Sequence, residues 1–203
     1  MKRIVAALIA VLLIGFSFTG CQKEPESEYS KYTRSFFDTF DTVVTVVAYT
    51  KSEDEFNAYF EKIQARFEHL HKLYDIYNEY EGINNIKTIN DNAGIKAVKV
   101  GKEIIDLILF AKDWNKRTNG KLNIALGSVL SIWHDYREEG INEPESANRP
   151  PMEELKAAAE HTDIDQVIVD VENSTVFLAD KMMRLDVGGV AKGYATEIVA
   201  KEI

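Results

Sequence analysis

The chain alternates between segments with a helical repeat of apolar residues and segments whose apolar residues are nearly continuous. The clearest helical repeat covers Ser52–Tyr77. Its apolar stripe consists of Phe56, Tyr59, Phe60, Ile63, Phe67, Leu70 and Tyr74. Because residues three and four apart share one face of a helix, this spacing predicts an amphipathic helix, with Ser52 and Glu55 as a capping box at its start. A second repeat predicts a largely buried helix over Glu103–Arg117, which Gly120 would stop.

Segments rich in β-branched and aromatic residues predict strands. Phe36–Thr50 contains no Gly or Pro and predicts one long strand, or one strand with a bulge. Gln166–Glu172 and Thr175–Ala179 are separated by only two residues and predict a hairpin. Met183–Val187 predicts a third short strand. This mixture of helices with antiparallel strands favours the α+β fold class.

The remaining segments predict loops and shorter helices. Residues 78–94 and 140–149 are polar and predict loops, and residues 122–136 predict a turn that leads into a helix. Pro150 and Pro151 would open a short helix that ends near residue 161. A last helix is expected after two glycines, from about residue 190 to the end. Since such a helix needs neighbours to cover it, we expect the chain to be the N-terminal part of a longer domain.

The first residues have the pattern of a bacterial export signal. Two basic residues precede an apolar run over residues 4–18, which is too short for a stable membrane span. Small residues then precede Cys21, as in a lipobox, where the cysteine becomes a lipid-carrying N-terminus. We therefore expect a lipoprotein signal peptide over residues 1–20, a lipidated Cys21 with a flexible tether over residues 21–35, and a folded part over residues 36–203. The folded part would lie on the extracytoplasmic side of a bacterial cell membrane. A plain secretory signal with an incidental cysteine is the alternative.

Charge and composition narrow the class of function. The 203 residues include 33 acidic and 24 basic side chains, a formal net charge of −9, which argues against a protein that binds nucleic acid by neutralising phosphates. A hydrophobic content of 45% is ordinary for a globular domain. One Cys and four His exclude an internal disulfide and a Cys-rich zinc module, and we expect no zinc site.

The strongest chemical signal lies where the last predicted strand ends at Asp186 and two glycines lead into a helix. Backbone N–H groups at a helix start attract anions, glycines allow a phosphate to approach, and Lys192 adds positive charge. The glycine spacing differs from that of a Walker A loop and from GxGxxG. One interpretation is therefore a nucleotide or phosphate site. The other is a tight turn in which Asp186 only caps the helix.

The run D-V-G-G-V-A-K-G-Y-A over residues 186–195 resembles the signature of the ApbE-like family, the FAD:protein FMN transferases. Residues 38–42, 74–90 and 118–133 resemble three further motifs of that family, in the same order along the chain. The resemblance covers residues 36–203. It implies a T-fold-related α+β architecture that is incomplete at the C-terminus.

The resemblance also implies an activity and a set of site residues. Family members split FAD and transfer FMN to a threonine hydroxyl of a target flavoprotein, with release of AMP and dependence on Mg²⁺. The partner would be a flavoprotein of a membrane redox complex. The residues at the family's flavin-binding positions are Phe40, Tyr77, Lys121, Leu122, Asn123, Asp186 and Lys192. The backbone carbonyl of Gly189 matches a metal-binding position, and no catalytic residue is assigned.

The chain departs from the family's motifs at three places. Phe40-Asp41-Thr42 stands where Met-Gly-Thr is common, and Leu122–Ala125 stands where Phe-Asp-x-Thr is common, which removes a carboxylate and a hydroxyl. A later family segment with two Asp and a Thr completes the magnesium site, and no residue of this chain matches it. Two other functions therefore stay open: an extracytoplasmic lipoprotein that binds FAD without transferring FMN, and a structural or adhesive lipoprotein without a ligand.

Single residues also allow plainer interpretations. Phe40 on a Val-rich strand is typical of a core residue, and Tyr77 of a packed helix end. Asn123 is typical of a turn, and a lysine on a helix, such as Lys192, is usually solvated. Trp133 is expected in the core although it belongs to one of the motifs.

Overall fold

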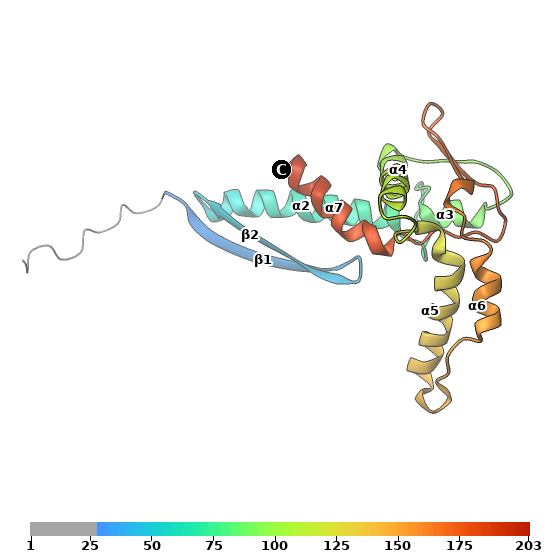
Figure 1. The fold of residues 1–203 in the computed structure, drawn as a ribbon. Helices are drawn as coiled ribbons and strands as arrows, with labels where there is room; N and C mark the ends of the chain where they lie inside the picture. The colour runs from blue at the N-terminus through green and yellow to red at the C-terminus, as the bar shows by residue number, and fades with distance from the viewer. Residues whose placement is uncertain (1–27) are drawn as a thin grey trace, which may run out of the picture.

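The computed structural model describes residues 28–203, and its N-terminal unit is a hairpin laid along a helix (Figure 1). Strands β1 (Ser30–Thr39) and β2 (Thr42–Thr50) pair in antiparallel fashion. Both contact the long helix α2 (Glu53–Tyr74), whose predicted start is confirmed because the Ser52 hydroxyl accepts a hydrogen bond from the Glu55 N–H (3.2 Å).

The second unit is a small antiparallel sheet with two helices. Strand β5 (Thr175–Leu178) lies between β3 (Val98–Lys99) and β4 (Val167–Asp170). Helix α3 (Ile86–Asp91) contacts β5, and α4 (Lys102–Arg117) contacts β4. The predicted β4–β5 hairpin and the helix before Gly120 are therefore confirmed, and the mixture of helices with antiparallel strands is α+β.

Three more helices complete the described chain. Helices α5 (Gly127–Asn142) and α6 (Met152–Ala159) pack against each other and project together from the rest of the molecule (Figure 1). The predicted loop over residues 140–149 is shorter than expected, because α5 continues to Asn142. Helix α7 (Gly188–Glu202) packs against α2, and an Arg66–Glu202 ion pair (2.7 Å) ties the two together.

Side chains of α2, α4, α7 and the small sheet form one core. The apolar stripe predicted on α2 is confirmed in large part, because Phe56, Phe60, Phe67, Leu70 and Tyr74 are buried. Trp133 was expected in this core but is 44% exposed, because it lies on the projecting helix α5. In the part of the chain that the structure describes, none of the helices has the length and apolar character that crossing a membrane requires.

The single strand predicted over Phe36–Thr50 is wrong, because the chain reverses at residues 40–41. Phe40 (φ 54°) and Asp41 (φ 50°) both adopt the left-handed conformation that tight hairpin turns use. Asn-Gly and Asp-Gly are the usual sequence signals for such a turn, and the sequence Phe40-Asp41 matches neither of them. A contact far along the chain supports the turn instead, because the Phe40 N–H donates to His71 Nδ1 on α2 (3.2 Å).

The folded part also begins earlier than expected. Residues 30–35, placed in the tether, belong to β1 and pair with residues 45–50 of β2. Their polar side chains suit a strand that is largely exposed, so polarity alone did not distinguish strand from tether. The signal peptide and Cys21 lie outside the described residues.

Replacing Asp41 by Gly is expected to raise the free energy of unfolding by about 0.5 kcal/mol. A residue with a Cβ is strained at positive φ, and glycine relieves this strain. The relief exceeds the extra conformational entropy that glycine loses on folding. Urea unfolding measures the change. Asp41→Ala is the control, since it removes the same carboxylate and keeps the Cβ. Equal stabilities of the two variants would contradict the backbone explanation.

Helix α3 lies inside the segment predicted as a loop over residues 78–94. Its start is a reciprocal cap: Asn85 Oδ1 accepts from the Thr88 N–H (3.0 Å), and Thr88 Oγ1 accepts from the Asn85 N–H (3.2 Å). Asn85 therefore acts as a helix-capping residue. The loop prediction failed because Asn85 was taken only as a turn residue, although asparagine is also a common N-cap.

The third strand predicted over Met183–Val187 is not a strand of either sheet. Its backbone bonds go to an asparagine side chain on one side and, on the other, to Ile124 in a short 3-10 helix and to Gly127 at the start of α5. Local apolar pattern therefore predicted a buried, straight segment correctly but could not supply a partner strand.

Candidate nucleotide-binding cleft

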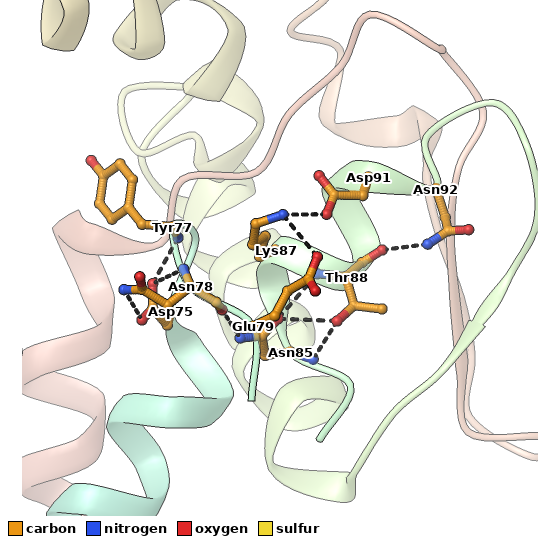
Figure 2. A network of polar contacts seen from close by, with 9 residues as sticks. All are labelled: Asp75, Tyr77, Asn78, Glu79, Asn85, Lys87, Thr88, Asp91 and Asn92. Atoms are coloured by element: carbon orange, nitrogen blue, oxygen red, sulfur yellow. Dashed lines mark hydrogen bonds and ion pairs between the residues drawn. The ribbon is translucent and has the colours of Figure 1, made fainter. Parts of the chain in front are cut away.

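The first wall of the site is the segment that follows α2. Asp75 is 7% exposed, and its carboxylate accepts four hydrogen bonds within the next five residues, of which Figure 2 shows those from Tyr77 and Asn78. The donors are the Tyr77 N–H (2.7 Å), the Asn78 N–H (3.1 Å), Asn78 Nδ2 (2.9 Å) and the Tyr80 hydroxyl (2.7 Å). This arrangement fixes the backbone at Tyr77 while its ring stays 55% exposed, turned away from these bonds in Figure 2.

Asp75 stays ionised in this position. Burial raises the pKa of the Asp75 carboxyl, but the hydrogen bonds from Tyr80, Asn78 and Tyr77 outweigh it, so the pKa lies below its usual range. Burial, together with the same carboxylate, raises the pKa of the Tyr80 hydroxyl to about 12. Asp75 is thus a fixed negative charge that orders the loop.

Residues at the start of helix α3 bind the backbone of the loop that contains Asp75 and Tyr77. The Asn85 side chain is fully buried and donates from Nδ2 to the carbonyls of Asn78 (2.8 Å) and Lys72 (3.1 Å), as Figure 2 shows in part. The Lys87 N–H donates to the Asp75 carbonyl (3.0 Å). The end of α2 and the start of α3 are therefore one rigid corner.

The turn between β1 and β2 forms the second wall. The Phe40 ring packs edge-on against Phe67 and His71 (centroid distances 6.5 and 5.5 Å) and lies 6.3 Å from the Tyr74 ring. Phe40 is only half-buried, so it is both a packed residue and a surface of the site.

The third wall is the start of α7. Asp186 Oδ1 accepts from the Gly188 N–H (2.8 Å) and so holds the turn that leads into α7. Asp186 is not the helix cap of the plainer interpretation, because Val187 is the N-cap residue and no side chain of the described residues caps this helix. The Asp186 N–H donates to the Ile124 carbonyl (2.8 Å), which fixes the residue from the other side. Asp186 remains half-buried, with its carboxylate at the edge of a cavity.

These three walls enclose a cleft of about 440 Å³, here called the central cleft. Four of the predicted site residues line it together: Phe40, Tyr77, Asp186 and Lys192. They come from the hairpin turn, the α2–α3 corner and α7, and the fold brings them together across up to 152 positions of sequence. Two further grooves, beside Trp133 and beside Ser131, also reach Tyr77 and Asp186.

Four other predicted residues lie elsewhere. Lys121, Leu122 and Asn123 do not line the central cleft or the two grooves that adjoin it. The Asn123 side chain is used within the fold, since Oδ1 accepts from the Ala125 N–H (2.9 Å) and Nδ2 donates to the Thr162 carbonyl (2.8 Å). Gly189 is exposed in the first turn of α7, and its neighbour Gly188 lines the cleft instead.

The cleft holds charges of both signs. Burial and the nearby Asp186 carboxylate raise the pKa of the Tyr77 hydroxyl, and Arg137 acts in the opposite direction. The Tyr77 ring lies 5.1 Å from the His134 ring, at an angle of 33°. Lys192 and Arg137 thus supply positive charge at the rim, where an anionic ligand would need it.

Sequence reasoning missed several residues of the cleft. His71, Asp75 and Arg137 line it, although none was predicted as a site residue. His71 and Asp75 lie at the end of the pattern that predicted helix α2. They were therefore interpreted only as residues of that helix. Arg137 lies on α5, and only the packing of that helix brings it to Tyr77.

Comparison with known proteins identifies the family. The model of the ApbE family matches residues 40–203. The chain belongs to the ApbE family. The resemblance found in the motifs is thereby confirmed, and the matched range includes every residue that lines the central cleft, whereas β1 lies just before it.

Relatives of known name share part of their length with this chain. It is 22% identical over 213 residues to an FAD:protein FMN transferase of Haemophilus influenzae, covering 100% of this chain and 56% of the relative. It is 29% identical over 140 residues to an FAD:protein FMN transferase of Klebsiella pneumoniae, covering 68% of this chain and 42% of the relative. The chain thus spans about half the length of these relatives.

Solved structures of ApbE proteins have the same fold. The ApbE protein of Thermotoga maritima matches with a TM-score of 0.69 and 25% identity, covering 85% of this chain and 52% of that one. The apo form of the flavinyl transferase ApbE of Pseudomonas stutzeri matches with a TM-score of 0.70 and 18% identity, covering 88% and 54%. The predicted ApbE-like α+β architecture is therefore confirmed.

Proposed function

We propose that this chain binds FAD in the central cleft as part of an FAD:protein FMN transferase. The observation that carries the proposal is the convergence of Phe40, Tyr77, Asp186 and Lys192 on one cavity. Four residues selected from separate motifs would rarely meet in space without a shared ligand. The names of the relatives from Haemophilus influenzae and Klebsiella pneumoniae support the same activity.

The reaction would be a phosphoryl transfer to a threonine hydroxyl of a target flavoprotein. A bond forms between the hydroxyl oxygen and the phosphorus of the FMN half, the hydroxyl loses its proton, and the pyrophosphate bond breaks so that AMP leaves with the bridging oxygen. Such transfers depend on positioning and on neutralising phosphate charge more than on covalent help from the protein.

This chain's own residues suit those needs in part. Tyr77 and Phe40 offer aromatic surfaces on which a flat ring can pack, and Lys192 offers a cation for the phosphates. Asp186 is placed to accept hydrogen bonds from a nucleotide while it also holds the start of α7.

Magnesium would supply further charge neutralisation when bound. The carboxylates of Asp41 and Asp186 line the cleft and are oxygen donors of the kind that Mg²⁺ prefers. Within residues 28–203, no three His, Cys, Asp or Glu side chains come together as a metal site. Asp41 and Asp186 are therefore oxygen donors of the type that suits Mg²⁺. Gly189 could offer only its backbone carbonyl.

The proposal includes a place in the cell. Cys21 would carry the lipid anchor, and the folded part would face the extracytoplasmic side of a bacterial membrane. The acceptor would then be a flavoprotein of a membrane redox complex. The export signal and the single cysteine of the sequence support this part of the proposal.

Two measurements on the chain test the proposal. FAD at a large excess should raise the melting temperature, since a ligand that binds only the folded state stabilises it. Lys192→Ala should weaken FAD binding about tenfold, whereas Lys201→Ala on the same helix should leave it unchanged, because Lys201 pairs with Glu197 away from the cleft.

Transfer itself is tested with Mg²⁺, FAD and a purified flavoprotein subunit of a bacterial redox complex. Magnesium-dependent release of AMP, with flavin bound covalently to the subunit, is the expected result. FAD binding without AMP release would favour the alternative function, FAD binding alone. A melting temperature unaffected by FAD would overturn both.

A further inference from the structure

Residues 184–186 run straight beside the central cleft, although no strand pairs with them. On one side, the Leu185 N–H donates to Asn90 Oδ1 (2.7 Å), and the Leu185 carbonyl accepts from Asn90 Nδ2 (2.9 Å). On the other side, the Arg184 carbonyl accepts from the Gly127 N–H (3.0 Å), and the Asp186 N–H donates to the Ile124 carbonyl (2.8 Å).

This pattern is that of a strand between two neighbours. In extended backbone, the N–H and C=O groups of one residue point to one side and those of the next residue to the other. The Asn90 amide therefore takes the place of a neighbouring strand and satisfies both polar groups of Leu185. Asn90 is 8% exposed and Leu185 is 1% exposed, so water does not readily replace these bonds.

The opposite side leaves no room for adjustment. A Cβ at Gly127 would lie 2.5 Å from the Arg184 carbonyl oxygen, so the two backbones are in close contact. Residues 184–186 are thus held between α3 and the start of α5. Asp186 follows Leu185 directly, so its position depends on both contacts.

Asn90 lies on α3, which also controls the opposite wall of the cleft. Asn85 at the start of this helix binds the Asn78 carbonyl next to Tyr77, and Asn90 in its last turn binds Leu185 next to Asp186. One short helix therefore sets the separation between the Tyr77 ring and the Asp186 carboxylate.

We propose that Asn90 is a positioning residue of the FAD site, which holds Leu185 and thereby sets where the Asp186 carboxylate enters the cleft. The inference rests on the proposed function. Asn90 lies in a motif of the sequence but was not among the predicted site residues, because its side chain acts through the backbone of a residue 95 positions away.

The test compares Asn90→Ala with Val176→Ala in the otherwise unchanged chain. Val176 is fully buried in β5 and pairs with Val98 and Val169, so its truncation loosens the core while every hydrogen bond of residues 184–186 stays in place. FAD affinity is measured by flavin fluorescence at a temperature where all variants are folded, and hydrogen exchange is followed at the Leu185 amide. Asn90→Ala is expected to weaken FAD binding about tenfold or more and to speed exchange at Leu185, while Val176→Ala leaves FAD affinity unchanged.

Asn90→Asp supplies a rescue that a purely structural defect elsewhere would not show. At neutral pH its carboxylate faces the Leu185 carbonyl without a proton to donate, so FAD binding should be weak. A protonated carboxyl has the shape of the amide and can donate, so affinity should recover as the pH falls, and Asn90→Ala should show no recovery.

The outcomes separate the two proposals. If the unmodified chain binds FAD and Asn90→Ala binds it as tightly as Val176→Ala does, the role of Asn90 is overturned and the proposed function stands. If the unmodified chain does not bind FAD, the proposed function falls and the positioning role falls with it.

Discussion

Replacing Asp75 by Ala is expected to lower the free energy of unfolding by about 3 kcal/mol. The substitution leaves four donors without their acceptor, and a buried donor that loses a charged partner is among the costly defects in a fold. The Tyr77 loop would lose its order, so FAD binding should weaken as well. Denaturant unfolding measures the stability, and Glu79→Ala is the matched control.

Glu79 lies in the same loop but is exposed and pairs only with Lys87 (3.2 Å). Its removal should change stability by less than about 0.5 kcal/mol, as is usual for surface ion pairs. Similar losses in the two variants would contradict the assignment of Asp75 as the organising carboxylate.

The Asp75 contribution should depend on pH with a defined sign. Its pKa in the folded state lies below its usual range, so the unfolded chain binds the proton more readily. The stabilisation is therefore fully present above about pH 4 and is lost as the pH falls through the pKa of the folded state. The stability difference between the unmodified chain and Asp75→Ala should shrink over that acid range. A difference that stays constant down to about pH 2 would count against a depressed pKa.

Replacing Asp186 by Ala is expected to weaken FAD binding by about 10- to 100-fold. A hydrogen bond to a charged group contributes about 1.5–3 kcal/mol, and this range corresponds to that loss of affinity. The same substitution removes the acceptor for the Gly188 N–H, so the first turn of α7 would also be less stable. Fluorescence titration with FAD measures the dissociation constant.

Two variants separate these effects. Asp186→Asn keeps an acceptor for the Gly188 N–H, so its melting temperature should stay near that of the unmodified chain while FAD binding remains weak. Asp135→Ala removes a carboxylate that lines the neighbouring groove but not the central cleft, so FAD binding should not change. Equal affinities of Asp186→Ala and Asp135→Ala would place the nucleotide elsewhere.

Much of the fold follows from short-range patterns. The stripe on α2 and the capping serine are read within a few turns of helix, and the β4–β5 hairpin within about a dozen residues. The glycine turn after Asp186 is equally local. These signals depend on neighbours in sequence, so the sequence alone determined these elements, and its ordered motifs determined the family.

The errors share a different cause. The chain reverses at Phe40 and Asp41 with no turn signal, and the Phe40 N–H binds His71, which lies 31 positions away. The polar residues 30–35 became a strand only because β2 lies beside them. Residues 183–187 have the pattern of a strand, but their partner is the Asn90 side chain.

The site was predictable as a set of residues but not as a cavity. The motifs identified Phe40, Tyr77, Asp186 and Lys192, and the tertiary structure decided that these four face one cleft while Asn123 is used in holding a turn. It also decided that Asp75 and Arg137 join them. The sequence by itself determined the amphipathic helices, the β4–β5 hairpin, the turn after Asp186 and the family. Tertiary structure alone decided what surrounds the cleft, because those contacts join groups that are far apart in the chain.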